Sequence, residues 1–349
     1  MNMEVNVYMP YYIISIHEKE LWNKYIQNSV MYDFYHTWYY NSLEKAGNPF
    51  LFVFQFQDDF IALPLIKREI EGSAFYDCTS VYGYAGPISS LPFEDLNGKI
   101  IQDFKEAFSN FLNNENIVSV FSRLHPIINQ ELLLERLGGI FDNGKTVAID
   151  LQLPLEEQKL RYRRAIRQKV NQLARKGFEV KEASTKEEII EFVKIYNENM
   201  IKVNASSYYF FDDQYFFDLL NSDDFESKLL LAYYDGEITS GGIVTLSNNI
   251  MQFHLAATRN EFLPDAPMKL LFHEAAVLGK SLGMSYLHLG GGVGGKEDSL
   301  FEFKSGFSDL HLSFKTWRYI ANLSAYNSLV EERCKDKEAA NNRFPLYRC

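Results

Sequence analysis

The chain carries one succession of helix and strand patterns twice, and this duplication constrains its fold more than any other feature. A helical pattern at residues 15–26 returns at residues 184–196, and each is followed by two strand-like runs joined by a polar turn. The turns fall at Asp58-Asp59 and at Asp235-Gly236. Matching patterns lie roughly 170 residues apart, about half of the chain, as expected for two copies of one structural unit.

The rest of each copy follows in the same order. A second helical pattern leads to a short apolar strand, and the copy closes with a short helix, a glycine, a phenylalanine and a last strand. These elements are expected at residues 98–112, 118–126 and 131–151, and again at 268–283, 285–292 and 298–317. We therefore predict an α/β protein with mixed sheets, divided into a first domain at 1–152 and a second domain at 153–349.

The composition limits the class of protein. Hydrophobic residues make up 46% of the sequence and aromatic residues 15%, which is enough for a large core. A formal net charge of −11 argues against a general nucleic-acid binder. The three cysteines (Cys78, Cys334 and Cys349) lie far apart, which favours a reducing compartment over a disulfide framework. With neither a leader pattern nor a long apolar run, we expect a soluble cytoplasmic protein.

A basic segment joins the two copies. Residues 155–176 are expected to form a linker helix, and the stretch from Lys159 to Lys176 holds eight Lys or Arg and no acid. The helix would bury a stripe formed by Leu160, Ile166, Val170 and Leu173. Two interpretations remain open for the arginines outside this stripe: a solvated helix face, or a contact with phosphate or another polyanion. The arginines proposed for such a contact are Arg163, Arg164 and Arg167.

The glycine cluster "GGGVGGKE" at 290–297 resembles a nucleotide-binding loop only in part. It fits G-x-G-x-x-G, but Glu297 stands where a Walker A loop needs Ser or Thr, and too little chain follows to complete a nucleotide-binding core. We therefore interpret Gly290, Gly291 and Gly292 as a turn that lets the end of a strand approach a ligand, or as a packing feature.

Helix starts are marked by residues that cap a first turn. Ser15 and Ser184 each precede a glutamate by three residues, the spacing of a capping box. After the glycine cluster, Asp298 or Ser299 is a natural N-cap for a short helix that carries "FEFK".

Several motifs in order resemble the FemABX family of aminoacyltransferases and its acetyltransferase relatives, which pair two GNAT domains. In the first half these are "FYHTWYY" (34–40), "LPLIKR" (63–68) and "YDCTSVYGYAGPI" (76–88). In the second half they are "YNENMIKVNASSYYFF" (196–211), "FHLAAT" (253–258), "LHLGGG" (287–292) and "DSLFEFKSGFS" (298–308). The resemblance covers nearly the whole chain and implies two tandem GNAT-like (acyl-CoA N-acyltransferase) domains with a cleft between them.

The resemblance also implies an activity. Such an enzyme moves an activated acyl or aminoacyl group onto an amine of a cell-envelope precursor, for example a peptidoglycan intermediate or an amino-sugar nucleotide. The donor would be acyl-CoA or aminoacyl-tRNA used as a substrate, with no tightly bound cofactor. The implied partners are a small-molecule or nucleotide-linked glycan or peptide acceptor and a charged tRNA, but not DNA. Peripheral contact with a membrane stays open. The alternative is a non-catalytic tandem GNAT protein that binds a peptide or glycan.

The same resemblance assigns candidate catalytic residues in the second half. Phe303-Lys304 matches a Phe-Lys pair that serves the reacting end of the donor, where an ammonium can stabilise an oxyanion. His254, in the middle of an expected strand, is a candidate base, although a buried core histidine is the stronger interpretation. The histidines and cysteines show no metal-binding spacing, so no metal is expected.

Candidate substrate-binding residues come from both halves. Lys202 falls where the family tends to carry a basic residue that binds the phosphates of the acceptor. Tyr208 and Tyr209 are adjacent, so only one of them can face a ligand in an extended stretch. In the first half, Asp77, Tyr82 and Tyr84 belong to a glycine-rich signature expected to form a loop that faces the cleft.

One departure from the family pattern concerns the donor. GNAT enzymes that use CoA usually hold its pyrophosphate on a glycine-containing loop before a helix. Residues 258–267 read "TRNEFLPDAP" and contain no glycine. Conventional CoA binding is therefore in doubt, which favours aminoacyl-tRNA or an unusual donor mode.

Overall fold

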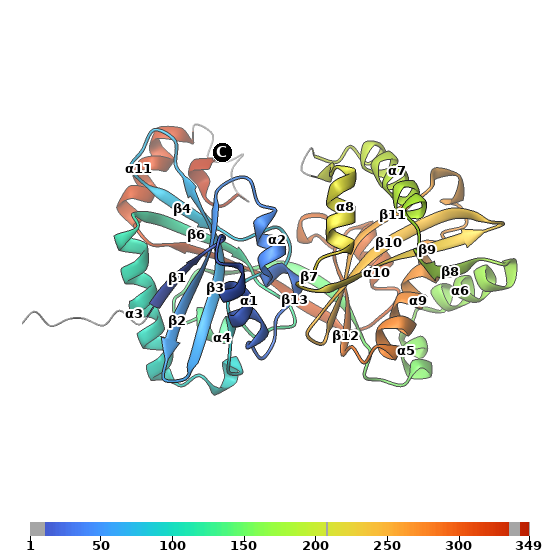
Figure 1. The fold of residues 1–349 in the computed structure, drawn as a ribbon, viewed down its shortest axis with the longest axis horizontal. Helices are drawn as coiled ribbons and strands as arrows, with labels where there is room; N and C mark the ends of the chain where they lie inside the picture. Colours follow the sequence, from blue (N-terminus) through green and yellow to red (C-terminus); the bar gives the residue numbers. More distant parts are fainter. Residues whose placement is uncertain (1–10, 207–208, 335–342, 349) are drawn as a thin grey trace, which may run out of the picture. The chain divides into compact units, whose positions relative to one another are not determined.

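The computed structural model describes residues 11–206, 209–334 and 343–348, which divide into two compact units (Figure 1). Unit 1 takes the chain up to Asn143 and again from Phe314 onward, and unit 2 takes Gly144–Ser313. The chain leaves unit 1 within strand β7 (Ile140–Asp150) and returns to it within β13 (His311–Ile320). Each unit is described separately below.

Unit 1 is built on a mixed sheet. Strands β1 to β4 are joined by antiparallel pairing in chain order, β4 then pairs with β6 in parallel, and β6 pairs with β13 in antiparallel. The bounds are β1 Tyr11–Ser15, β2 Asn48–Phe56, β3 Asp59–Glu69, β4 Tyr76–Thr79, β5 Ile88–Ser89 and β6 Ile117–Arg123. The fully buried runs of β2 and β3 explain why their sequences are apolar almost without interruption.

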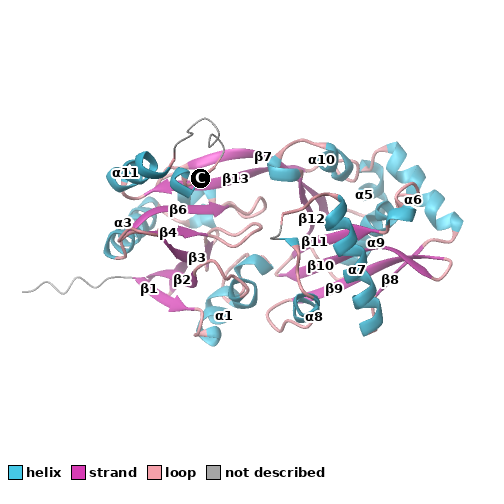
Figure 2. Ribbon diagram, turned by 90° about the horizontal axis from the view of Figure 1, so that it is seen from above, coloured by secondary structure: helices cyan, strands magenta, loops and turns pink. Residues whose placement is uncertain are grey.

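The helices of unit 1 are α1 Lys19–Gln27, α2 Trp38–Ser42, α3 Gly98–Asn114, α4 Glu131–Leu134 and α11 Leu323–Arg333. Figure 2 shows α1, α3 and α11 from a second direction. Helix α3 buries an aromatic stripe against one face of the sheet, with Phe104 and Phe108 packed on Phe52 and Trp317. Asn97 caps this helix by accepting hydrogen bonds from two backbone N–H groups of its first turn. Helix α11 contacts β6.

Unit 2 repeats this plan in the order β7-β12-β11-β10-β9-β8. Its strands are β8 Glu179–Glu182, β9 Glu226–Tyr234, β10 Glu237–Ser247, β11 Ile250–Thr258 and β12 Tyr286–Gly291. Its helices are α5 Leu155–Arg161, α6 Arg164–Lys176, α7 Lys186–Lys202, α8 Asp213–Leu220, α9 Met268–Ser281 and α10 Ser299–Lys304. β11 and β12 form its parallel pair, as β4 and β6 do in unit 1.

The helix and strand patterns therefore repeat as expected, but the expected domain boundary differs from the compact units. The division at 152/153 placed residues 314–349 in the second domain, whereas the structure groups them with unit 1. The reason is an exchange of closing strands. The last strand of the first copy, β7, pairs with β12 of unit 2, and the last strand of the second copy, β13, pairs with β6 of unit 1.

The linker is two helices instead of one. α5 ends at Arg161, and Tyr162 and Arg163 are extended before α6 begins. Tyr162 is buried against the ring of Phe307, and the backbone N–H of Arg163 donates to the carbonyl oxygen of Gly306 over 2.8 Å. This packing breaks the helical periodicity, which leaves Leu160 71% exposed instead of in the expected buried stripe. The other three stripe residues are buried.

The capping residues are partly as expected. The box of the second copy is formed by Thr185 and Glu188, one residue later than the expected Ser184. In the first copy Ser15 does bind the Glu18 carboxylate, but α1 begins only after Glu18. Of the two residues expected as the N-cap of α10, Asp298 is the one that caps it, and Ser299 is the first residue of the helix.

Trp317 gives a direct test of the strand exchange. Its indole is fully buried in the core of unit 1, and its N–H donates to the carbonyl oxygen of Gly138 over 2.8 Å. Trp317→Ala removes a large core side chain, so we expect about 3–5 kcal/mol loss in the free energy of unfolding, measured by urea denaturation. Leu323→Ala, at a 62% exposed position in the same unit, is the control and should stay within about 0.5 kcal/mol. Equal effects would contradict the placement of β13 in this core.

Candidate active site

Two parallel strands diverge near the centre of the sheet in unit 2. The pairing of β11 with β12 spans Ile250 to Gln252 on one strand and Tyr286 to His288 on the other. Beyond these residues β12 continues to pair with β7 as far as Gly291, while β11 continues to pair with β10 as far as Thr258. β7 therefore holds β12, and β10 holds β11, while the facing edges of β11 and β12 separate. Ligands of α/β proteins commonly bind at the carboxyl ends of such parallel strands.

β11 carries an irregularity at the point of divergence. Phe253 pairs with Val244 and Leu255 pairs with Ile243, so His254 between them is the extra residue of a β-bulge. Its Nε2 lies 3.2 Å from the hydroxyl of Tyr215 on α8, whose ring stacks on Phe211. Desolvation by burial lowers the pKa of His254 to about 3, so the imidazole is neutral at pH 7.

Helix α10 places a lysine at the end of β12. The carboxylate of Asp298 accepts hydrogen bonds from the backbone N–H groups of Leu300 and Phe301, which fixes the first turn of the helix. Lys304 is the last residue of this helix, and its Nζ donates to the carbonyl oxygen of Gly291 over 2.7 Å. Burial lowers the pKa of Lys304 to about 8, and the negative charge of Asp298 acts in the opposite direction.

At pH 7 a group with a pKa near 8 is mostly protonated, and it can still give up a proton more readily than an ordinary lysine. An ammonium has three N–H donors, and the bond to Gly291 uses one of them. Lys304 can therefore offer positive charge and a transferable proton to an atom held near the ends of β11 and β12. This is the chemistry that acyl transfer requires at its oxyanion and its leaving group.

Comparisons with known proteins concern the fold that carries these residues. Residues 161–305 match the family described as acetyltransferase (GNAT) domain, a span that lies inside unit 2. Over this span unit 2 has a GNAT fold. The sequence matches no curated protein.

Solved structures extend the likeness to the whole fold. The chain is similar to the crystal structure of FemX, with 12% identity over 89% of this chain and 98% of that one, at a TM-score of 0.70. L-PGS from Bacillus licheniformis shares 16% identity over 77% and 85% of the two chains (TM-score 0.51). The C-terminal domain of a putative lysylphosphatidylglycerol synthetase from Agrobacterium fabrum shares 16% over 80% and 88% (TM-score 0.50). The chain has a FemX-like GNAT fold.

The glycines beside the GNAT site are required by the protein's own backbone. A Cβ on Gly291 would lie 2.7 Å from the carbonyl oxygen of Lys145, the β7 residue beside it. A Cβ on Gly292 would lie 2.1 Å from the carbonyl oxygen of Lys296, and Gly290 has a φ of +75°. Close packing therefore accounts for the cluster, whereas the approach to a ligand expected from the sequence stays a proposal.

Two of the three expected phosphate-binding arginines of the linker already have partners in the GNAT unit. Arg163 pairs with the Glu302 carboxylate at 2.8 Å, which ties α6 to the helix that carries Lys304. Arg167 donates to the carbonyl oxygen of Leu160 at the end of α5. Arg164 is exposed. Arg163 and Arg164 are both exposed, whereas Arg167 is half-buried, and the phosphate contact expected of these arginines stays a prediction.

Two further candidates lie elsewhere in the GNAT unit. Lys202 is the last residue of α7 and is exposed, with its Nζ 3.0 Å from Oδ1 of Asn260. Tyr209 is half-buried, and its carbonyl oxygen accepts a hydrogen bond from Tyr196. Tyr208 lies outside the described residues.

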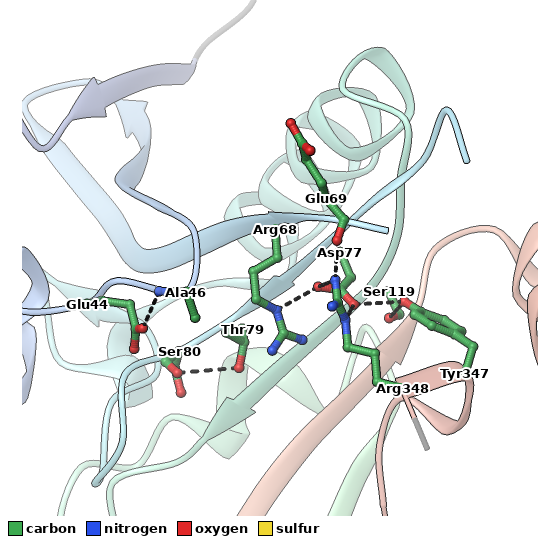
Figure 3. Close-up of polar contacts among 10 residues, drawn as sticks. All are labelled: Glu44, Ala46, Arg68, Glu69, Asp77, Thr79, Ser80, Ser119, Tyr347 and Arg348. Carbon is green, nitrogen blue, oxygen red and sulfur yellow. Dashed lines mark hydrogen bonds and ion pairs between the residues drawn. The ribbon is translucent and has the colours of Figure 1, made fainter. Parts of the chain in front are cut away.

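Asp77 has a structural role that the sequence did not indicate. It lies on β4, not in the expected loop, and its side chain is fully buried. As Figure 3 shows, the guanidinium groups of Arg68 and Arg348 both point at its carboxylate, with Nε–oxygen distances of 2.8 and 2.6 Å. Tyr347 also donates to it, and shares a 2.7 Å hydrogen bond with Ser119. Asp77 therefore ties residues 343–348 to β4 of unit 1, and its carboxylate is engaged by these contacts.

The other two residues of that signature do lie in a loop. Tyr82 is 40% exposed, and Tyr84 packs edge-on against Tyr35, His125 and Phe314. Two buried groups hold this loop. His125, whose ring contacts Tyr84, pairs with Asp33 at 3.1 Å. Gln130 donates hydrogen bonds to the carbonyl oxygens of Ala85 and Pro87. Sequence reasoning missed these supports and Tyr215, because their partners are 39 or more positions away.

The remaining expectations concern metals and membranes. Among the described residues, no set of three or more His, Cys, Asp or Glu side chains is grouped so that it could hold a metal ion. None of the described helices has the length and apolar character needed to cross a bilayer.

The pKa of Lys304 can be tested with a single charge change. Asp298→Asn keeps one oxygen for the helix cap but removes the charge that raises the Lys304 pKa, so the pKa should fall below its value of about 8 in the unchanged chain. NMR titration of the Lys304 side chain measures this pKa in the variant and in the unchanged chain. Because the folded chain releases this proton at lower pH than an unfolded lysine, the free energy of unfolding should rise with pH from about 8 to 10.5. A higher pKa in Asp298→Asn would refute this account of the site.

Proposed function

We propose that the protein is an N-acyl or aminoacyl transferase that acts on an amine of a cell-envelope precursor, with Lys304 at the reacting centre. The observation that carries the proposal is the position of the Lys304 ammonium, 2.7 Å from the carbonyl oxygen of Gly291 and beside the divergence of β11 and β12 in a GNAT domain. The likeness to FemX and L-PGS supports transfer of this kind, because the chain shares its fold with these two proteins.

The proposed step is nucleophilic acyl substitution. The neutral amine of the acceptor attacks the donor's carbonyl carbon, which forms the C–N bond and places negative charge on the carbonyl oxygen. Lys304 stabilises this oxyanion through the N–H groups that Gly291 does not use. The intermediate then expels the thiolate of CoA or the ribose oxygen of tRNA, which takes a proton, while the new amide loses one from nitrogen.

His254 fits a supporting role in this step better than that of a base. With a pKa of about 3 it would accept a proton only weakly at neutral pH. It remains a neutral hydrogen-bonding group held by Tyr215 at the bulge of β11. Phe303 packs against Phe272 and Phe307, so it contributes an apolar wall that holds α10 in place.

The region in which a GNAT domain binds CoA favours a donor other than acyl-CoA. The turn before α9 contains no glycine, and α9 begins after Pro267, whose side chain makes no capping hydrogen bond. Asp265 lies in this turn, where it pairs with Lys176 on α6. A carboxylate at the start of a helix opposes the binding of pyrophosphate there. We therefore propose aminoacyl-tRNA as the first donor to test and acyl-CoA as the second.

The test compares both donors with one catalytic variant. The full chain is incubated with labelled aminoacyl-tRNA and, separately, with labelled acetyl-CoA, together with amine acceptors that include a nucleotide-linked muropeptide and an amino-sugar nucleotide. Lys304→Ala should lower kcat by about 100-fold or more, the usual cost of losing an oxyanion donor. Lys304→Arg, which keeps the charge, should retain more activity than Lys304→Ala.

Lys186→Ala is the matched control, because it removes an exposed lysine from the first turn of α7 in the same unit. It should transfer at the rate of the unchanged chain. If Lys304→Ala transfers as fast as this control, Lys304 is not catalytic. If the unchanged chain binds an acceptor but transfers nothing from either donor, the non-catalytic binding protein becomes the better description.

A further inference from the structure

Two arginines occupy neighbouring positions on one face of the sheet in unit 1. Arg123 is the last residue of β6, and Arg318 lies on β13. In the antiparallel register Arg123 is opposite Thr316, and Arg318 is opposite Phe121. Residues two apart on a strand share a face, so the two arginines are diagonal neighbours on the same side of the sheet.

Arg123 is held by aromatic rings. Its guanidinium lies 5.2 Å from the ring centre of Tyr82 and 5.3 Å from that of Phe121. Contacts of this kind hold the plane of the guanidinium and leave the N–H groups at its edge for other partners. Among residues 11–206, 209–334 and 343–348, no carboxylate forms an ion pair with Arg123.

Arg318 is held by neutral polar groups. Its Nε donates to the hydroxyl of Thr316 over 3.2 Å, and one terminal nitrogen donates to Oδ1 of Asn143 over 2.9 Å. Asn143 in turn donates to the same Thr316 hydroxyl, and the ring of Phe141 lies 4.9 Å from the guanidinium. Burial lowers the pKa of Arg318. The described part of the chain supplies it with no carboxylate either.

The neighbouring arginines of this unit show that the fold does neutralise such charges elsewhere. Arg68 and Arg348 share the buried carboxylate of Asp77. Asp77 lies on β4, the strand that pairs with β6 in the same sheet. The chain has 46 acidic residues, so acidic partners are plentiful. Arg123 and Arg318 have no acidic partner among the described residues, and two such charges at neighbouring positions cost free energy through repulsion and desolvation. A bound anion would offset that cost.

We propose that Arg123 and Arg318 form an oxyanion-binding site on unit 1, which takes the phosphate or carboxylate group of a ligand. The two guanidinium groups are held by aromatic rings, a hydroxyl and an amide, and their N–H edges suit an oxyanion that accepts several hydrogen bonds. Tyr82 and Phe141, 40% and 48% exposed, present ring surface for the adjoining part of the ligand. The site follows the parallel strands β4 and β6 at their carboxyl ends, and it does not depend on transfer at Lys304.

Binding of small probes to the full chain tests the site without any transfer reaction. Pyrophosphate and citrate serve as the phosphate and carboxylate probes, and calorimetric titration measures each dissociation constant. Arg123→Gln and Arg318→Gln should each weaken the preferred probe by about tenfold or more, since a hydrogen bond to a charged group is involved. The lysine variants Arg123→Lys and Arg318→Lys should lose less. The probe that binds more tightly identifies the phosphate or the carboxylate as the natural group.

Arg136→Gln is the matched control, since Arg136 is an exposed arginine of the same unit and its loss changes the net charge equally. Its affinity should be that of the unchanged chain. Equal weakening in Arg136→Gln would show only diffuse attraction and overturn the site, as would the absence of binding at millimolar probe. NMR of the arginine Nε–H signals in the unchanged chain keeps the test valid if a variant fails to fold. Addition of the preferred probe should shift the signals of Arg123 and Arg318, and unmoved signals refute the proposal.

Discussion

The structure depends on the hydrogen-bonded ladders that the two closing strands make outside their own half of the sequence. β7 pairs with β12 from Asp150 to Thr146, and β13 pairs with β6 from Thr316 to Ile320. Neither sheet is complete without the strand that the other copy supplies. The aromatic core of unit 1 likewise includes Trp317, which lies far along the chain from the helix that covers it.

The same ladders shape the candidate active site. Because β7 holds β12 as far as Gly291, and β10 holds β11 as far as Thr258, the two inner strands can part after only three paired positions. Gly291 is then in contact with two elements: the backbone of Lys145 on one side and the ammonium of Lys304 on the other. Three features therefore depend on the same packing: the lowered pKa of Lys304, the Asp298 cap of its helix, and the glycines that precede the helix.

Local patterns predicted much of this, and the failures share a physical cause. Helix α9, the turn at Asp235-Gly236 and the Asp298 cap could be predicted because each depends on neighbours within a few residues. The break at Tyr162 could not, because it comes from burial against Phe307.

Partners that are distant in sequence were the other source of failure. The buried role of Asp77 depends on Arg348, which is 271 positions away. A strand pattern also does not say which sheet the strand will join, and so the expected boundary at 152/153 differs from the bounds of the compact units. Lys304 was proposed as a catalytic residue by resemblance. Its hydrogen bond to Gly291 and its lowered pKa could be found only from the structure.

The discontinuity of unit 1 has a consequence for synthesis on the ribosome. Chains emerge from the N-terminus, and early domains usually fold first. Here unit 2, Gly144–Ser313, is one uninterrupted segment and is fully emerged while unit 1 still lacks the edge that β13 provides. The second half of the gene product can therefore reach its native sheet before the first half. Until residues 316–320 arrive, β6 has an unpaired edge, so a nascent chain carries its aggregation risk in the portion made earliest.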